Sequence, residues 1–190
     1  MQRGKADFGL LLVGMLWGLG FVFVKIGLNE GITPFYLLTI RFLVAFIILF
    51  VIFRSRLKNI EKSDLKNGFI IATFLFLGFA FQISGAALTT ASNNAFFTAI
   101  NVIIVPYIFW AIHKHVPNIF SFIAAGLCIL GVGILSFDSK MQLNQLNEGD
   151  ILTIISALFF AFHIAFTGFL STKSEPIKLN VIQMGFASVY

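Results

Sequence analysis

Long apolar runs separated by short polar connections form the main pattern of this 190-residue chain. A hydrocarbon core about 30 Å thick needs about 20 mostly apolar residues of helix to cross it. Seven such runs are Phe8–Leu28, Phe35–Phe53, Gly68–Leu88, Ala91–Ile112, Pro117–Phe137, Asp150–Leu170 and a run from near Ile177 to Tyr190. Strict alternation of apolar and polar residues, the pattern of a membrane β-barrel, is absent. The pattern predicts an all-α integral membrane protein, a polytopic bundle of transmembrane helices.

The third and fourth runs need a turn between them. No Asp, Glu, Lys or Arg occurs from residue 67 to residue 112, and this stretch is too long for one span. Its middle, from Leu88 to Asn94, is polar and small enough to turn. Within the second of the two predicted helices, Pro106 is expected to produce a kink.

Composition narrows the class of protein further. Hydrophobic residues make up 58% of the chain and charged residues only 11%, whereas soluble domains carry roughly 25% charged residues. A soluble chain could not bury this much apolar surface. The composition therefore excludes a soluble globular protein, a disordered chain and, with Cys128 as the one cysteine, a disulfide scaffold.

Basic residues gather in alternate connections. The N-terminus and the second, fourth and sixth connections together carry ten of them: Arg3, Lys5, Arg54, Arg56, Lys58, Lys62, Lys66, Lys114, Lys173 and Lys178. The opposite side carries only Lys140. Since cytoplasmic connections are enriched in Lys and Arg, this distribution predicts a cytoplasmic N-terminus. It also explains the net charge of +5 without a nucleic-acid partner.

The two halves of the chain resemble each other. At an offset of 143 positions Asp7 falls on Asp150, and small and aromatic residues recur in register, with one residue fewer in the next connection. The aligned pairs are Gly14 with Ala157, Trp17 with Phe160, Gly18 with Ala161, Phe23 with Phe166, Pro34 with Pro176 and Arg41 with Gln183. Because five is an odd number, a five-helix unit followed by its copy gives an inverted repeat, from which many secondary transporters are built.

This repeat predicts the domain organisation. The first five-helix unit covers residues 1–137, a Gln- and Asn-rich connection covers 138–148, and the first two helices of the second, inverted copy cover 149–190. The second copy breaks off within its second helix. The chain is therefore expected to be a fragment that lacks about three and a half helices.

Several of these residues form motifs of a known family. They are Leu16-Trp17-Gly18-x-x-Phe-x-x-x-Lys25, Pro34-x6-Arg41, the run from Ala87 to Phe96, and Gly131-Val-Gly-Ile-Leu. In this order and spacing they resemble EamA-type transporters of the drug/metabolite transporter superfamily. The resemblance implies a ten-helix, inverted-repeat carrier of small metabolites in the inner or plasma membrane.

Two basic residues lie within predicted spans and are candidates for substrate binding. Arg41 lies about 10 Å below the outer face at 1.5 Å per residue, where a charge costs roughly 2.5–3.5 kcal/mol unless it faces a wet cavity or a partner. It could anchor a carboxylate or phosphate, or cap carbonyls of the first helix. Lys25 lies near the outer end of its helix, where it could snorkel to the interface or join Arg41 at a cationic mouth.

Polar and aromatic residues inside the spans complete the candidate site. Gln82, Asn94 and Asn101 could line a cavity or hydrogen-bond between helices. Trp17 could stack on a substrate or pack against glycines. His163 could relay a proton or form a neutral hydrogen bond in the core.

These features predict a secondary transporter of small metabolites that works by alternating access. Lys25 and Arg41 favour anionic or zwitterionic, amino-acid-like solutes. The alternatives are a flippase for lipid-linked substrates and a structural membrane subunit that does not transport. We expect no enzymatic activity, metal or cofactor, because the chain lacks a P-loop, a metal-ligand spacing and a Gly-x-Ser-x-Gly motif. The expected partners are a small-molecule substrate and the lipid bilayer; a dimer and a coupling ion stay open.

Overall fold

The computed structural model describes residues 2–114, 118–136 and 147–190. The described residues are helical apart from turns and short connections, and no strand occurs among them. The helices are α1 (Gln2–Asn29), α2 (Pro34–Phe53), the 3₁₀ turn η1 (Arg54–Arg56), α3 (Lys62–Leu88), α4 (Ala91–Ala99), α5 (Asn101–His113), α6 (Ile119–Ser136), α7 (Glu148–Leu170) and α8 (Pro176–Ala187).

The predicted fold class, an all-α membrane bundle, is confirmed. Within the described residues, five segments are long and apolar enough to cross a membrane. They are Asp7–Asn29, Pro34–Arg56, Lys62–Leu88, Ala91–Ile112 and Glu148–Leu170. The predicted start at Pro117, the end at Phe137 and the connection at 138–146 lie outside the described residues. Helix α6, Ile119–Ser136, lies within the predicted range Pro117–Phe137.

Two helix starts and one helix end differ from the sequence prediction. Helix α3 begins at Lys62 and not at Gly68, because Glu61 and Asp64 form a capping box in which the Glu61 N–H donates to Asp64 Oδ2 over 3.1 Å. Helix α1 likewise begins at Gln2, well before the apolar run. Polar residues at these ends extend each helix beyond its apolar run. Helix α8 ends at Ala187 instead of continuing to Tyr190.

The predicted helix over Ala91–Ile112 is wrong in one respect, because it is two helices. The break is at Ile100, whose N–H donates to the carbonyls of Phe97 and Thr98, a tightening of the 3₁₀ type. Pro106 was expected to kink this helix, but it lies inside α5, beyond the break. Proline has no N–H to donate, and its ring crowds the preceding helical turn. The break at Ile100 lies just before the turn that precedes Pro106.

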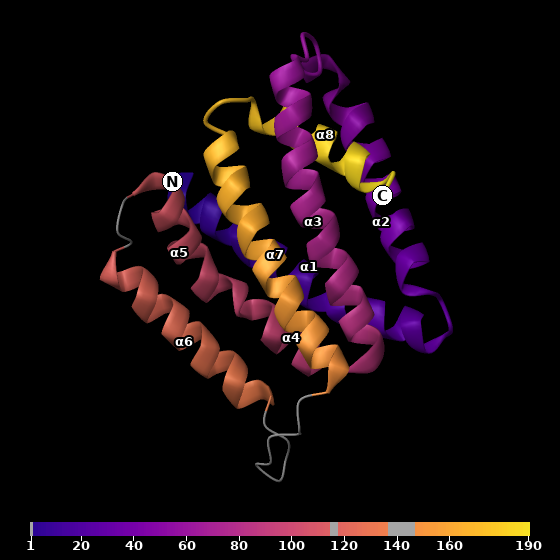
Figure 1. Cartoon of the computed structure of the whole chain (residues 1–190), viewed down its shortest axis with the longest axis vertical. Helices are drawn as coiled ribbons and strands as arrows, with labels where there is room; N and C mark the ends of the chain where they lie inside the picture. Colours follow the sequence, from indigo (N-terminus) through magenta and orange to yellow (C-terminus); the bar gives the residue numbers. More distant parts are fainter. Residues whose placement is uncertain (1, 115–117, 137–146) are drawn as a thin grey trace.

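Helices α3 and α7 lie side by side at the centre and run in opposite directions (Figure 1). Helices α5 and α6 flank them on one side and α2 and α8 on the other, while α1 crosses behind (Figure 1). The close approach of α3 and α7 depends on Gly85. A Cβ on this residue would lie 2.6 Å from the carbonyl oxygen of Gly149. Only glycine allows the two backbones to approach this closely.

Small residues pack differently in α7 and in α1. Ala157, Ala161 and Ala165 of α7 are each fully buried. A Cβ added to Gly14 or Gly18 of α1 would meet no described atom within 4 Å. Among the described residues, no helix approaches α1 closely at these two glycines.

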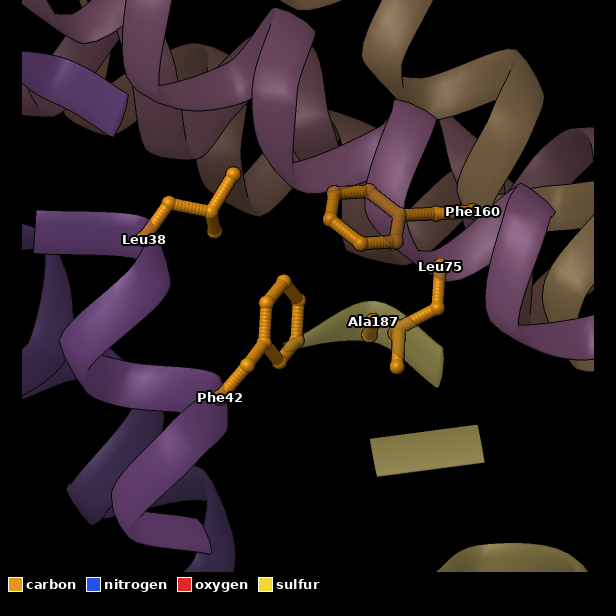
Figure 2. Packing of buried hydrophobic residues seen from close by; sticks show 5 residues of the cluster. All are labelled: Leu38, Phe42, Leu75, Phe160 and Ala187. Carbon is orange, nitrogen blue, oxygen red and sulfur yellow. The ribbon is translucent and has the colours of Figure 1, made fainter. Parts of the chain in front are cut away.

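One hydrophobic cluster joins the two sides of the bundle. Its buried members come from α2, α3, α7 and α8 and converge on a common centre (Figure 2). They are Leu38, Phe42, Leu75, Phe160 and Ala187. Because Phe42 and Phe160 also line the cavity described below, this cluster fixes one wall of the candidate site.

We expect Gly85→Ala to destabilise the protein. The added methyl must push α3 away from Gly149, and overpacking of this kind costs about 1–3 kcal/mol. Thermal unfolding in detergent should show a lower Tm. Gly14→Ala, with open space at its Cβ, is the matched control and should leave Tm unchanged or slightly raised. Equal behaviour of the two variants would contradict the central role of the α3–α7 contact.

Candidate functional site

Helices α1, α2, α3, α4, α5, α7 and α8 together enclose a cavity of about 360 Å³. This volume lies within the usual range for small-molecule sites. Six of the seven predicted site residues line it: Trp17, Arg41, Gln82, Asn94, Asn101 and His163. These residues come from six helices and span nearly 150 positions of sequence, and the fold brings them to one space.

Arg41 is the one Lys or Arg residue that lines the cavity among the described residues. Its guanidinium carbon lies 4.4 Å from the centre of the Phe79 ring, in a cation–π contact. Within the described residues it makes no hydrogen bond and no ion pair, so it does not cap carbonyls of α1. No Asp or Glu lines the cavity in the same part of the chain. The guanidinium therefore keeps its full capacity to bind an anion.

Lys25 is the predicted site residue that the cavity does not include. Its Nζ donates to the carbonyls of Ala86 over 2.8 Å and of Thr89 over 2.6 Å. Carbonyls in the last turn of a helix have no intrahelical partner and carry the negative end of the helix dipole. Lys25 therefore ties α1 to the end of α3, and it does not line the cavity with Arg41.

A buried carboxylate lies next to this contact. Asp150, which is 1% exposed, accepts a hydrogen bond from Thr89 Oγ1 over 2.6 Å. It also accepts one from the N–H of Asn147 over 3.1 Å, within the capping box that starts α7. Through Thr89 the Lys25 and Asp150 contacts join α1, α3 and α7 at one end of the bundle.

The three predicted amides divide into two that bind protein and one that is open. Asn94 Nδ2 donates to the carbonyl of Gln82 over 3.0 Å and to Thr153 Oγ1 over 2.8 Å, so it holds α3, α4 and α7 together. Gln82 Nε2 donates to Thr98 Oγ1 over 3.1 Å. The side-chain amide of Asn101, at the start of α5 and next to the helix break, makes no hydrogen bond with any described residue. It is the amide that a ligand can use most freely.

His163 belongs to a chain of polar side chains on α7 and α8. Its Nε2 lies 2.9 Å from Gln183 Oε1, and Gln183 Nε2 donates to Asn180 Oδ1 over 2.7 Å. All three side chains line the cavity. Trp17 lies on α1 with 66% of its side chain exposed, at the edge of the cavity and away from the packed core.

Sequence reasoning missed several residues of the cavity wall. Phe79, Thr98, Phe160 and Asn180 were not singled out as site residues, although Phe160 and Gln183 had been recognised as the repeat partners of Trp17 and Arg41. Aromatic residues are frequent throughout this chain, so no local signal distinguishes those that face the cavity. The useful signal was the offset between the halves.

Positions related by that offset line the same cavity in pairs. At an offset of 143 these are Trp17 with Phe160, Gly20 with His163 and Phe21 with Ile164; at 142 they are Arg41 with Gln183 and Phe42 with Met184. Helices α2 and α8 both begin with proline, Pro34 and Pro176. Helix α7 runs in the opposite direction to α1 (Figure 1), as an inverted repeat requires.

Comparison with known proteins adds the family and the length. Residues 4–137 match the family model described as the EamA-like transporter family. The chain is 36% identical over 179 residues to an "Uncharacterized transporter" of Archaeoglobus fulgidus, covering 94% of this chain and 54% of the relative. It is 26% identical over 198 residues to another "Uncharacterized transporter" of that organism, covering 100% of this chain and 66% of the relative. The chain thus spans between half and two thirds of the length of these relatives. No solved structure matches it significantly.

We expect Lys25→Met to loosen α1 from the bundle. The substitution leaves the carbonyls of Ala86 and Thr89 without their donor, and hydrogen bonds to a charged group are worth about 1.5–3 kcal/mol. Tm in detergent should fall, whereas Lys25→Arg, which keeps donors at this point, should lose less. Lys58→Met in the exposed connection after α2 is the control and should leave Tm unchanged. An unaltered Tm for Lys25→Met would show that this contact does not hold α1.

Proposed function

This chain belongs to the EamA-like transporter family, and from that premise we propose that it moves small anionic or zwitterionic metabolites across the membrane by alternating access. The family and the relatives are named as transporters, which supports the general activity. The residues that line the cavity support the substrate class. Transport by the whole protein is part of the same proposal.

The unpaired guanidinium of Arg41 carries the argument for substrate class. A charge within a membrane-spanning helix needs water, a partner or a ligand, because hydrocarbon solvates it poorly. Phe79 gives Arg41 a partial partner through its ring face, and no described carboxylate of the cavity neutralises it. A substrate that brings its own carboxylate would complete this site. The amide of Asn101 supplies further hydrogen-bonding capacity in the same cavity.

The interrupted helix α4–α5 supports a transport role. Transporters commonly form substrate sites where a membrane helix is broken, because the break exposes polar groups to a cavity. Here the break is at Ile100, and the residues on either side of it, Thr98 and Asn101, both line the cavity. The irregular backbone therefore borders the space that a substrate would occupy.

Alternating access is supported by the pairing of positions across the cavity. The first repeat unit, residues 1–137, and the second unit, from residue 149, each contribute their first two helices to the wall. An inverted pair of units around a central site can expose that site first to one side and then to the other by rocking. The pairs at offsets of 143 and 142 positions are the observation that favours this mechanism.

The orientation that we propose has the N-terminus in the cytoplasm and the protein in the plasma or inner membrane. The start of α1, the connection after α2, the end of α5 and the connection before α8 lie at one end of the bundle (Figure 1). The ten basic residues counted above lie in these segments or at the starts of α3 and α8. Their position favours that end as the cytoplasmic one.

We expect an impermeant maleimide to label Glu30→Cys and not Lys58→Cys in right-side-out membrane vesicles. Both variants would carry Cys128→Ser, so each contains one thiol. Glu30 lies in the connection after α1 and Lys58 in the connection after α2, at opposite ends of the bundle. Permeabilised vesicles, in which both positions should react, are the control. Labelling of Lys58→Cys alone in sealed vesicles would reverse the proposed orientation.

We expect Arg41→Gln to abolish most transport of carboxylates. Uptake of a labelled panel that includes phenylacetate, alanine and glutamate would be measured with the intact transporter in proteoliposomes. For each carboxylate that is transported, uptake at low concentration should fall about ten- to hundredfold, because one charge-assisted hydrogen-bonding partner is lost. Arg41→Lys should keep part of the activity.

Two controls make this result specific. Tm should be nearly unchanged in Arg41→Gln, because the side chain makes no hydrogen bond with the described residues, and binding of the uncharged analogue phenylacetamide should not fall. Undiminished uptake of every transported carboxylate by correctly folded Arg41→Gln would remove the anchor role. If no member of the panel is transported by the wild type, the proposed substrate class is wrong.

A further inference from the structure

Two groups of polar side chains lie at the cavity wall. The first pole is the cation Arg41, and the second pole is the hydrogen-bonded series His163, Gln183 and Asn180. We propose that this pole selects organic anions that carry a hydrogen-bond donor, a hydroxyl or an ammonium, at the other end of an apolar body. The inference rests on the proposed function, because it assumes that the carboxylate of the same substrate binds Arg41. It adds a second requirement that a substrate must satisfy.

The hydrogen bonds within this chain fix which groups stay open. Gln183 is 5% exposed and holds His163 through its oxygen, over 2.9 Å. An amide oxygen only accepts hydrogen bonds, so the proton of the neutral imidazole is on Nε2. The other ring nitrogen, Nδ1, then has a lone pair and makes no hydrogen bond with a described residue.

Asn180 holds Gln183 in place in turn. Its Oδ1 accepts from Gln183 Nε2 over 2.7 Å, which directs the oxygen of Gln183 towards His163. Gln183 is therefore a positioning residue, and His163 is the group that contacts the substrate. An imidazole held with an open acceptor inside a cavity fits a ligand with an O–H or N–H donor.

An apolar surface connects the two poles. The order of contacts from the cation to the histidine is Arg41, Phe79, Phe160, His163. Arg41 lies over the Phe79 ring, and the rings of Phe79 and Phe160 meet edge to face with centroids 4.9 Å apart. His163 follows Phe160 by one helical turn of α7, on a neighbouring part of the same face. The body of the substrate would lie along these two rings.

The internal repeat explains why the two poles differ. Arg41 and Gln183 occupy equivalent positions of α2 and α8, while Gly20 and His163 occupy equivalent positions of α1 and α7. The first copy thus contributes a cation and a glycine to the cavity wall, and the second copy contributes a neutral amide and a histidine. Equivalent helices of the two copies surround the cavity, but the residues at equivalent positions differ in chemistry. The cavity can therefore hold an asymmetrical substrate in one orientation.

A matched pair of ligands tests the second pole directly. Phenylacetate and 4-hydroxyphenylacetate differ only in the hydroxyl, and their dissociation constants would be measured on the intact transporter in detergent. We expect wild type to bind the hydroxylated ligand about two- to tenfold more tightly, the effect of one buried hydrogen bond. In His163→Phe the ratio should fall to about one, while the affinity for phenylacetate changes little.

Further variants separate the possible causes of a change. His163→Gln, which restores an acceptor, should recover part of the preference. Gln183→Leu should lower the ratio by releasing the imidazole, and it also serves as the test if His163→Phe does not fold. Arg41→Gln should weaken both ligands equally and leave the ratio unchanged. Asn67→Leu removes a different interhelical amide contact, to Ser174, away from the cavity, and should change neither affinity.

The outcomes distinguish this inference from the proposed function. Binding of phenylacetate that depends on Arg41 but shows no preference for the hydroxyl would overturn the second pole and leave the anion site standing. A preference that survives both His163→Phe and Gln183→Leu would also overturn it. Failure of the wild type to bind either ligand would remove both proposals.

Discussion

The close contact between α3 and α7 is the constraint on which the rest of the structure depends. Where Gly85 meets Gly149, two backbones approach so closely that no side chain fits between them. Beside this contact, Asn94 donates to both α3 and α7 through Gln82 and Thr153. A bilayer core offers no water to satisfy a buried polar group. An amide such as Asn94 must therefore find its partners within the bundle, and the alignment of α3 and α7 supplies them. The same alignment leaves a cavity that residues of both helices line.

The distinction between paired and open polar groups follows from this arrangement. Lys25 and Asp150 carry charge but are used at the junction of α1, α3 and α7, where carbonyls and hydroxyls satisfy them. Arg41 faces the cavity with only the Phe79 ring for a partner among the described residues. In a medium of low polarity, paired groups stabilise the fold and open ones are available to a ligand. This difference separates the residues that hold the bundle from those proposed to bind substrate.

Much of the fold and six residues of the cavity wall were predictable from the sequence. The absence of charge between residues 67 and 112 required two helices, and Arg41 in an apolar run required a cavity or a partner. Boundaries were less accurate, because the capping pair Glu61 and Asp64 continues α3 into polar sequence. The break at Ile100 was not predictable, since Pro106 pointed to a position further along. Lys25 was assigned to the interface or to a cationic mouth, and its carbonyl partners come from a distant helix.

The sequence by itself determined which segments are helices, that they belong in a membrane, and which residues are too polar for lipid. These properties depend on local composition and on regular spacing, which a linear pattern contains. Only the tertiary structure decided which polar groups are satisfied and which stay open. Asn94 and Asn101 share one residue type, one predicted helix and one cavity, yet the amide of the first is bound to Gln82 and Thr153 while the amide of the second has no hydrogen-bond partner among the described residues. Their roles differ because hydrogen-bond partners come from helices far away in sequence.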